Sequence, residues 1–378
     1  IQRGISDIHI EPDEKLLRIR SRKDGILHER LVRQGNIQNA LISLLKLMAG
    51  LNITERRLPQ DGRFHTRIQG RSVDVRLSTL PQQHGESVVL RLLDQNSVVT
   101  SLDQTGMSDE MLARFRRLIG IPNGLILVTG PTGSGKSTTL YGALSEMNSP
   151  EVKIITVEDP VEYALPRVTQ VQVREQIGLD FARVLRTSLR QDPDIVMVGE
   201  IRDSDTAEIA LRAAITGHRV LSTLHTNDAV SSANRLLDMG VQPFMLAAAL
   251  RGVVAQRLLR RVCPQCDRPR PANDDEIACR RRAGEADPAS LMIHEGDGCP
   301  FCEHSGYSGR VGLFELVEVD EGMREALRRS NISEFTQRAG QSPTYRPIQD
   351  MALDFIRRGT TNVMEVIRVF GEVAGEEN

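Results

Sequence analysis

The sequence predicts an α/β protein with more than one domain, in which a small α+β domain precedes a larger domain built on a parallel sheet. Length is the first observation, because 378 residues exceed what one ordinary hydrophobic core contains. The second is a change of pattern, from short alternating apolar and polar runs to β-branched runs separated by helix-length segments. The third is a glycine-rich loop at residues 130–138, directly after one of those β-branched runs.

Composition argues against some classes of protein. A net charge of −2, 3% aromatic residues and no Trp disfavour a dedicated nucleic-acid binder. No apolar run approaches the roughly 18 residues that would cross a bilayer, so we predict no integral membrane protein. The chain begins at Ile1 without an initiator Met or a leader, and we expect it to be a fragment that lacks upstream residues.

Residues 1–95 form the predicted α+β domain. Alternating patterns predict strands at 5–10, 16–20, 73–77 and 88–92, and apolar residues at helical spacing predict one amphipathic helix over 37–51. Residues 96–110 are polar, lack periodicity and contain Gly106, which is typical of a linker.

Residues 111–258 form the predicted parallel-sheet domain. Its apolar, β-branched runs at 125–128, 154–157, 195–198 and 220–224 predict buried strands with helices on both faces of the sheet. A cysteine module over residues 259–312 and a mainly helical region over residues 313–378 complete the expected order.

The glycine-rich loop has the complete pattern of a phosphate-binding loop. Its glycines let the backbone curl so that many N–H groups face one triphosphate, and the lysine adds a charge for the β and γ phosphates. The following serine offers a hydroxyl to magnesium, and the helix that starts there directs its N-terminus at the phosphates. We therefore predict ATP and Mg²⁺ bound by Gly130, Pro131, Thr132, Gly133, Ser134, Gly135, Lys136, Ser137 and Thr138.

Two carboxylates and a histidine follow other strands of the same predicted sheet. Glu158 follows the run 154–157, and Glu200 follows the run 195–198 with Gly199 in the place where a Walker B motif has its Asp. ATP hydrolysis needs one carboxylate for magnesium and another for the attacking water, so both are candidates, although acidic residues at strand ends are often only solvated. His225 follows the run 220–224 and is either a phosphate sensor or a structural histidine.

Four cysteines are arranged as two CxxC pairs, Cys263 with Cys266 and Cys299 with Cys302. Four thiolates close a tetrahedron without an open position, so we predict a structural Zn²⁺; unmetallated thiols or disulfides are the alternatives. Cys279 lies outside either pair, and the arginine run at 280–282 is typical of a solvated face.

Five blocks of sequence resemble the bacterial secretion ATPases of the type II secretion and type IV pilus assembly family. They lie at residues 6–12, at 58–63 with 74–76, at the phosphate loop, at 155–160 and at 190–203, and the segment 223–227 resembles the His box of the family. The resemblance covers almost the whole chain, and it makes Gly199-Glu200 the family's own form of Walker B.

The resemblance implies a PAS-like first domain, a RecA-like P-loop motor domain and a homohexamer with nucleotide between the two domains. It further implies that Arg63 and Arg76 offer guanidinium groups to the γ phosphate, whereas pattern alone makes them solvating residues on a strand face. Glu200 is assigned to metal or water positioning, Glu158 to polarising the attacking water, and His225 to reporting the γ phosphate. Which glutamate is the base stays open.

The function that the resemblance implies is that of a cytoplasmic ATPase, peripheral on the inner membrane, which powers type II secretion through pseudopilus assembly and export across the outer membrane. The cysteine module favours secretion or type IV pilus extension, because the pilus retraction ATPases lack it. Expected partners are an inner-membrane platform protein and a membrane-anchored secretion-system protein, which docks mainly through the missing N-terminal region. A nucleic-acid translocase and a non-enzymatic nucleotide-binding scaffold are alternatives of other classes, although we expect no nucleic acid.

Overall fold

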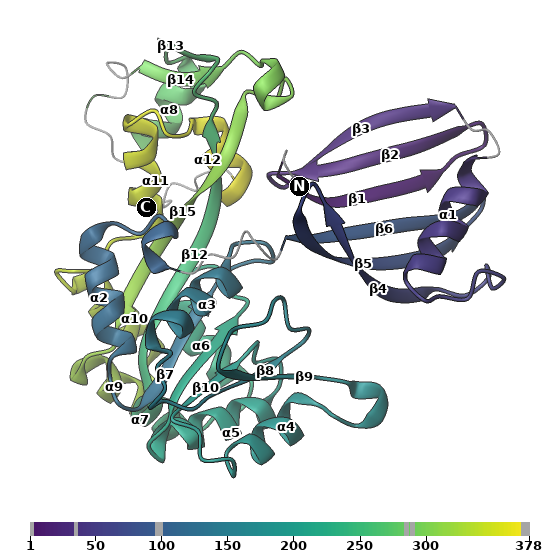
Figure 1. Cartoon of the computed structure of the whole chain (residues 1–378). Coiled ribbons are helices and arrows are strands. Elements are labelled where there is room, and N and C mark those ends of the chain that lie inside the picture. Colours follow the sequence, from purple (N-terminus) through teal and green to yellow (C-terminus); the bar gives the residue numbers. More distant parts are fainter. Residues whose placement is uncertain (1–3, 34–36, 95–100, 283–286, 288–291, 372–378) are drawn as a thin grey trace. The chain divides into compact units, whose positions relative to one another are not determined.

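The computed structural model describes residues 4–33, 37–94, 101–282, 287 and 292–371. The chain divides into two compact units, Ile1–Val98 and Val99–Asn378, which are described separately (Figure 1). Residues 96–100 of the predicted linker lie outside the described residues. None of the helices in the described ranges is long and apolar enough to cross a membrane.

The first unit is a six-stranded antiparallel sheet with one helix. Apolar residues of the central strands, such as Val73, Val75 and Leu77, are buried with Ile42 and Leu45 of the helix, so one face of the sheet is covered. The α+β class is confirmed, while the short sequence runs missed two strands. In the order β3-β2-β1-β6-β5-β4, the strands are β1 (Ile5–Pro12), β2 (Leu16–Lys23), β3 (Ile26–Arg33), β4 (Gln60–Ile68), β5 (Arg71–Gln82) and β6 (Gly85–Asp94), with helix α1 (Ile37–Met48).

The second unit contains a seven-stranded sheet. All strand pairs in it are parallel except the pair β12–β15. The four predicted strands are all present. In the order β15-β12-β7-β11-β10-β8-β9, the bounds are β7 (Gly124–Thr129), β8 (Ile154–Glu158), β9 (Val168–Gln172), β10 (Ile195–Val198), β11 (Arg219–Leu224), β12 (Leu250–Val262) and β15 (Tyr307–Glu318).

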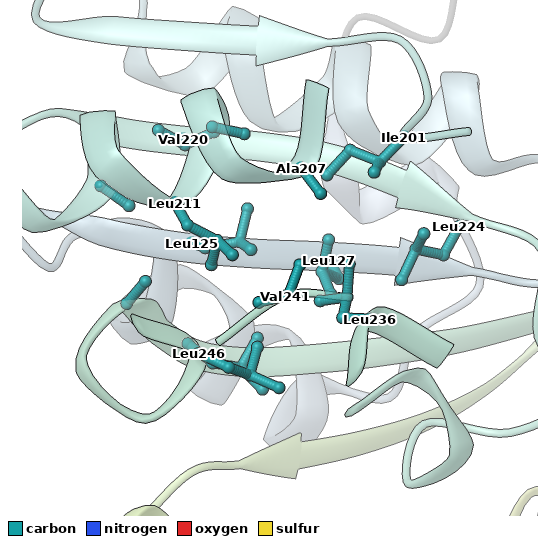
Figure 2. Packing of buried hydrophobic residues seen from close by; sticks show 14 of the residues in the cluster. Leu125, Leu127, Ile201, Ala207, Leu211, Val220, Leu224, Leu236, Val241 and Leu246 are labelled. Atoms are coloured by element: carbon teal, nitrogen blue, oxygen red, sulfur yellow. The ribbon is translucent and has the colours of Figure 1, made fainter. Parts of the chain in front are cut away.

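Helices cover both faces of this sheet, which explains why its central strands are continuously apolar. Leu125 and Leu127 of β7 pack with Leu211 and Leu246 on one face (Figure 2), whereas Ile126 packs in a separate cluster on the other. The helices of this part are α2 (Asp109–Ile119), α3 (Lys136–Met147), α4 (Phe181–Ser188), α5 (Ser204–Ile215), α6 (Ser231–Asp238) and α7 (Pro243–Ala249).

The C-terminal part differs from the prediction at its start. We expected mainly helix after residue 312, but strand β15 continues to Glu318, because Leu313, Phe314 and Leu316 are buried in the sheet beside β12. Strands β12 and β15 therefore cross the predicted boundaries at 258 and 312. The remaining elements are β13 (Asp267–Pro271), α8 (Asp274–Arg282), β14 (Met292–Gly296), α9 (Glu321–Arg328), α10 (Ile332–Gln341), α11 (Ile348–Arg357) and α12 (Val363–Phe370).

Candidate nucleotide site and cysteine cluster

The register of the parallel strands brings the predicted site residues to one edge of the sheet. Thr129, the last residue of β7, lies opposite Leu224 of β11 and Ala255 of β12. Val198 of β10 lies opposite Val157 of β8. The phosphate loop, Glu158, Glu200 and His225 therefore all follow strands that end at the same edge, where open α/β sheets bind their ligands.

The phosphate loop adopts the curled backbone that its glycines predict. Gly130, Gly133 and Gly135 have φ values of 148°, 78° and 89°, in the region that favours glycine. A Cβ at Gly130 would lie 2.3 Å from the carbonyl oxygen of Gln256, so this position also needs glycine for close packing on β12. Helix α3 starts at Lys136, which directs its first N–H groups at the loop.

Lys136 bends back over the loop that precedes it. Its Nζ donates hydrogen bonds to the carbonyl oxygens of Gly130 at 2.8 Å and Pro131 at 3.0 Å. Burial lowers the pKa of Lys136 to about 8; the charge of Glu200 acts in the opposite direction, and that of Arg257 adds to the lowering. The loop thus places an ammonium group where phosphate charge would stabilise its protonated form.

Ser134 also fits a phosphate cradle. Its side chain is buried, and its Oγ makes no hydrogen bond within the described part of the chain. A buried hydroxyl without a partner is costly unless a group at the site accepts a hydrogen bond from it. Phosphate oxygens are acceptors of this kind.

Glu200 lies at the centre of a network of charged side chains. Its carboxylate accepts a hydrogen bond from Arg202 and lies 3.5 Å from His225 Nε2. Arg202 also reaches Asp159, with 3.6 Å between Nη1 and Oδ2. The structure therefore joins the two predicted residues Glu200 and His225. It adds Arg202, which the sequence signalled only by its place two residues after Glu200.

Gly199 stands beside this glutamate at a position where the neighbouring strand leaves little room for a side chain. Its N–H donates to the carbonyl oxygen of Val157 at 2.7 Å. A Cβ at Gly199 would lie 3.2 Å from that oxygen and 3.3 Å from Glu158 Cα. An Asp at this position would therefore crowd the backbone of β8, which favours glycine here with the acidic side chain at residue 200.

Glu158 occupies a more enclosed place than the prediction supposed. Its side chain is 3% exposed. One carboxylate oxygen accepts from Thr156 Oγ1 and Gln170 Nε2, and the other accepts from Tyr141 of α3. Burial, followed by the nearby Glu158 charge, raises the pKa of Tyr141, so the phenol remains a donor. The role assigned to Glu158 in polarising the attacking water stays a prediction.

Strand β12 supplies two further polar residues that sequence reasoning missed. Gln256 Oε1 accepts from Thr139 Oγ1 at 2.8 Å, and Gln256 Nε2 lies close to Gly135. Arg257 donates to the carbonyl oxygen of Asn227 at 2.7 Å. Both interrupt the apolar run of β12 between Val253 and Leu259, and polar residues within such a run are the signal that could have found them.

Arg63 and Arg76 lie opposite one another on β4 and β5 of the first unit. The two units are described separately, so the assigned contact of these arginines with the γ phosphate stays a prediction.

The four predicted cysteines come together. The Sγ distances are 3.9 Å for Cys263 to Cys299 and 3.8 Å for both Cys266 to Cys302 and Cys299 to Cys302. Four thiolates about 2.3 Å from one zinc ion would lie about 3.8 Å apart, whereas disulfides need about 2.05 Å, so the cluster fits a metal and not bridges. The side chain of Cys279, on α8, lies outside what the structure describes.

Comparison with known proteins decides the family. Residues 1–368 match the model of the family described as "Type II/IV secretion system protein". The chain belongs to this family. It is 49% identical over 372 residues to the type II secretion system ATPase E of Vibrio cholerae, covering 98% of this chain and 73% of that protein. It is 50% identical over 373 residues to the type II secretion system protein E of Pectobacterium carotovorum, covering 98% and 74%.

Solved structures agree with this assignment. The crystal structure of the pilus retraction motor PilT with bound ADP has a TM-score of 0.68 and 26% identity, and the match covers 98% of this chain and 95% of that one. The Legionella pneumophila ATPase DotB has a TM-score of 0.70 at 22% identity, covers 98% and 91%, and supports the fold alone. The predicted RecA-like class, the family and the ATPase activity in type II secretion are confirmed.

Proposed function

We propose that this ATPase hydrolyses Mg-ATP at the carboxyl edge of its seven-stranded sheet and works as a homohexamer that drives assembly of the secretion pseudopilus. The observation that carries the site assignment is the convergence of the phosphate loop, Glu200 and His225 at one edge, with Glu200 held between His225 and Arg202. A non-enzymatic scaffold needs the cradle alone and has no use for this network.

Each residue has a distinct role in the proposal. Lys136 and the loop N–H groups bind the phosphates, and Ser137 and Glu200 are the oxygen donors that would hold Mg²⁺. When bound, Mg²⁺ neutralises phosphate charge. Arg202 and His225 orient the Glu200 carboxylate from two sides. Glu158 polarises the attacking water once its internal donors rearrange.

The first unit completes the site in the proposed assembly. Arg63 and Arg76 supply permanent positive charge to the γ phosphate, which suits their forked donors. The hexamer acts at the cytoplasmic face of the inner membrane through a platform protein and a membrane-anchored partner. Zn²⁺ held by the four cysteines is structural, because four thiolates leave no position for a substrate.

Turnover by the purified full chain tests the assigned roles. Lys136→Ala is expected to abolish ATP binding, whereas Glu200→Gln is expected to keep binding and to lose turnover by roughly 100-fold or more, because general acid–base and metal positioning contribute about that much. Glu208→Gln on α5, which changes an exposed carboxylate paired with Arg212, is the matched surface control. Full activity in both site variants would overturn the assignment. DNA-stimulated, salt-sensitive turnover would support a translocase instead.

A further inference from the structure

The loop that carries His225 is attached to the C-terminal part of the chain through a buried carboxylate. This loop, residues 225–230, joins β11 to α6 and is called the His225 loop below. Glu315 of β15 is 1% exposed, and its Oε1 accepts a hydrogen bond from the backbone N–H of Ala229 at 2.9 Å. Its Oε2 accepts from the backbone N–H of Ile348 at 3.1 Å. One carboxylate therefore holds two segments that lie more than a hundred residues apart in sequence.

The Ile348 contact ties the start of one C-terminal helix, α11, to the carboxylate that also holds this loop. Ile348 is the first residue of α11, and the N-cap Pro347 supplies no side-chain hydrogen bond to the helix start. Glu315 takes up one of the N–H groups that a helix N-terminus leaves without an intrahelical partner. The Tyr345 hydroxyl hydrogen-bonds to the same carboxylate.

Arg257 holds the other side of the His225 loop. Its side chain is 6% exposed, and Nη2 donates to the carbonyl oxygen of Asn227 at 2.7 Å. Its Nη1 donates to the carbonyl oxygen of Gln256 at 3.3 Å, and a Cβ built on Gly130 would lie 3.3 Å from that nitrogen. The guanidinium thus lies between the first glycine of the phosphate loop and the His225 loop.

Strand register places these two residues side by side. Ala255 lies opposite Glu315 and Arg257 lies opposite Leu313 across β12 and β15, so Arg257 and Glu315 are diagonal neighbours on one face. Burial lowers the pKa of Arg257, whereas the negative charges of Asp228, in the loop itself, and of Glu315 act in the opposite direction. Burying a carboxylate and a guanidinium is costly, and in some proteins such groups are retained because they fix one arrangement of the chain.

We propose that Glu315 and Arg257 are positioning residues of the ATPase site, which hold the His225 loop from two sides so that His225 stays against Glu200 beside the phosphate loop. Glu315 fixes the loop at Ala229 and ties it to the start of α11, and Arg257 fixes it at Asn227. Neither residue touches the reacting atoms. The inference rests on the proposed role of His225.

Glu315→Gln tests the first contact with little change of shape. Each oxygen of the Glu315 carboxylate accepts a hydrogen bond from a backbone N–H, whereas an amide offers only one accepting oxygen and turns its NH₂ group toward the second N–H. One of the two backbone contacts must then break. We expect kcat to fall roughly 3- to 30-fold, the range for residues that couple to a site without touching it, with a smaller change in KM.

Glu365→Gln is the matched control. Like Glu315, Glu365 is a buried carboxylate that accepts a hydrogen bond from a backbone N–H, in this case that of Arg260 on β12. It ties β12 to α12, however, and among the described residues it has no contact of this kind with the His225 loop. Thermal unfolding is measured for both variants, and Glu365→Gln is expected to lose stability without the loss of kcat. An equal loss of kcat in the two variants at equal stability would overturn the proposal.

A double-mutant cycle separates this proposal from the assignment of His225. If Glu315 acts through His225, its substitution should matter little once His225 is gone. In a His225→Ala background we therefore expect Glu315→Gln to lower kcat less than about 2-fold, because the effects of substitutions in one coupled unit are not additive. Arg257→Met is expected to behave in the same way. A full loss from Glu315→Gln in both backgrounds overturns the positioning role alone. Wild-type kcat for His225→Ala overturns the role of His225 and with it this inference.

A milder variant covers the case in which Glu315→Gln does not fold. Tyr345→Phe removes only the hydroxyl that hydrogen-bonds to Glu315. We expect a smaller loss of kcat, again absent when His225 is Ala. A loss that persists without His225 would count against the proposal.

Discussion

Nucleotide affinity is expected to depend on pH through Lys136. The pKa of this ammonium is about 8, mainly because it is buried, so the free protein loses the charge as pH rises through that value. Triphosphate binds the protonated form and raises its pKa by adding negative charge. The protonated fraction falls from about three quarters near pH 7.5 to about one tenth near pH 9, so the apparent Kd should rise about eightfold.

A fluorescent ATP analogue measures this dependence directly, with the apparent Kd determined at several values between about pH 7.5 and 9. Lys136→Arg is the control, since a guanidinium keeps its charge throughout, and its Kd should be flat over this interval even if binding is weaker. In Glu200→Gln the transition should move to lower pH, because the Glu200 charge raises the pKa of Lys136. An apparent Kd that stays constant in the wild-type chain would refute this account of Lys136.

Two further predictions concern the frame of the site. Metal analysis should find about one zinc ion per chain. Cys302→Ser should lose the zinc and some thermal stability, whereas Cys279→Ser should keep both. A wild-type chain that contains no metal and is as stable as Cys302→Ser would contradict a zinc site at the four cysteines. Gly199→Ala should lower the free energy of unfolding in urea by about 1–3 kcal/mol, because the new Cβ would lie 3.2 Å and 3.3 Å from backbone atoms of β8, which must shift to make room. Gly340→Ala is the control, because a Cβ at this position of α10 meets nothing within 4 Å; the free energy of unfolding should stay unchanged or rise slightly.

The parts of the site that the sequence predicted are those whose residues are dictated by local chemistry. The phosphate loop needs glycines at positive φ and a lysine at a fixed spacing, so the pattern alone identifies it. The four cysteines are similar, since metal ligation requires the thiolates themselves. Strands β7, β8, β10 and β11 were predictable because a parallel sheet covered on both faces must be apolar at consecutive positions.

Residues whose role depends on register across the sheet were not predictable in this way. Arg257 and Glu315 belong to strands far apart in sequence, and only the pairing of β12 with β15 makes them neighbours. Strand β15 itself was expected to be helical beyond residue 312, because its buried run 312–317 is too short for periodicity to separate helix from strand. Pattern alone made Gly199 a departure from Walker B and the resemblance made it the family's own form, but only the closeness of β8 gives the physical reason for a glycine there.

The same two strands join the cysteine cluster to the nucleotide site. Arg257 lies on β12 six residues before Cys263, a distance of about 20 Å along an extended strand, and β15 begins shortly after Cys302 and reaches Glu315. The N–H of Cys263 donates to the carbonyl oxygen of Gly306 at 2.9 Å, and Val262 pairs with Tyr307 beyond a shift in register. A slip of β15 by one residue along β12 would move every side chain of β15, Glu315 included, to the opposite face of the sheet and away from Arg257. Zn²⁺ bound by all four cysteines, as proposed, would cross-link the far end of the pair and oppose the slip that would separate the His225 loop from its two supports.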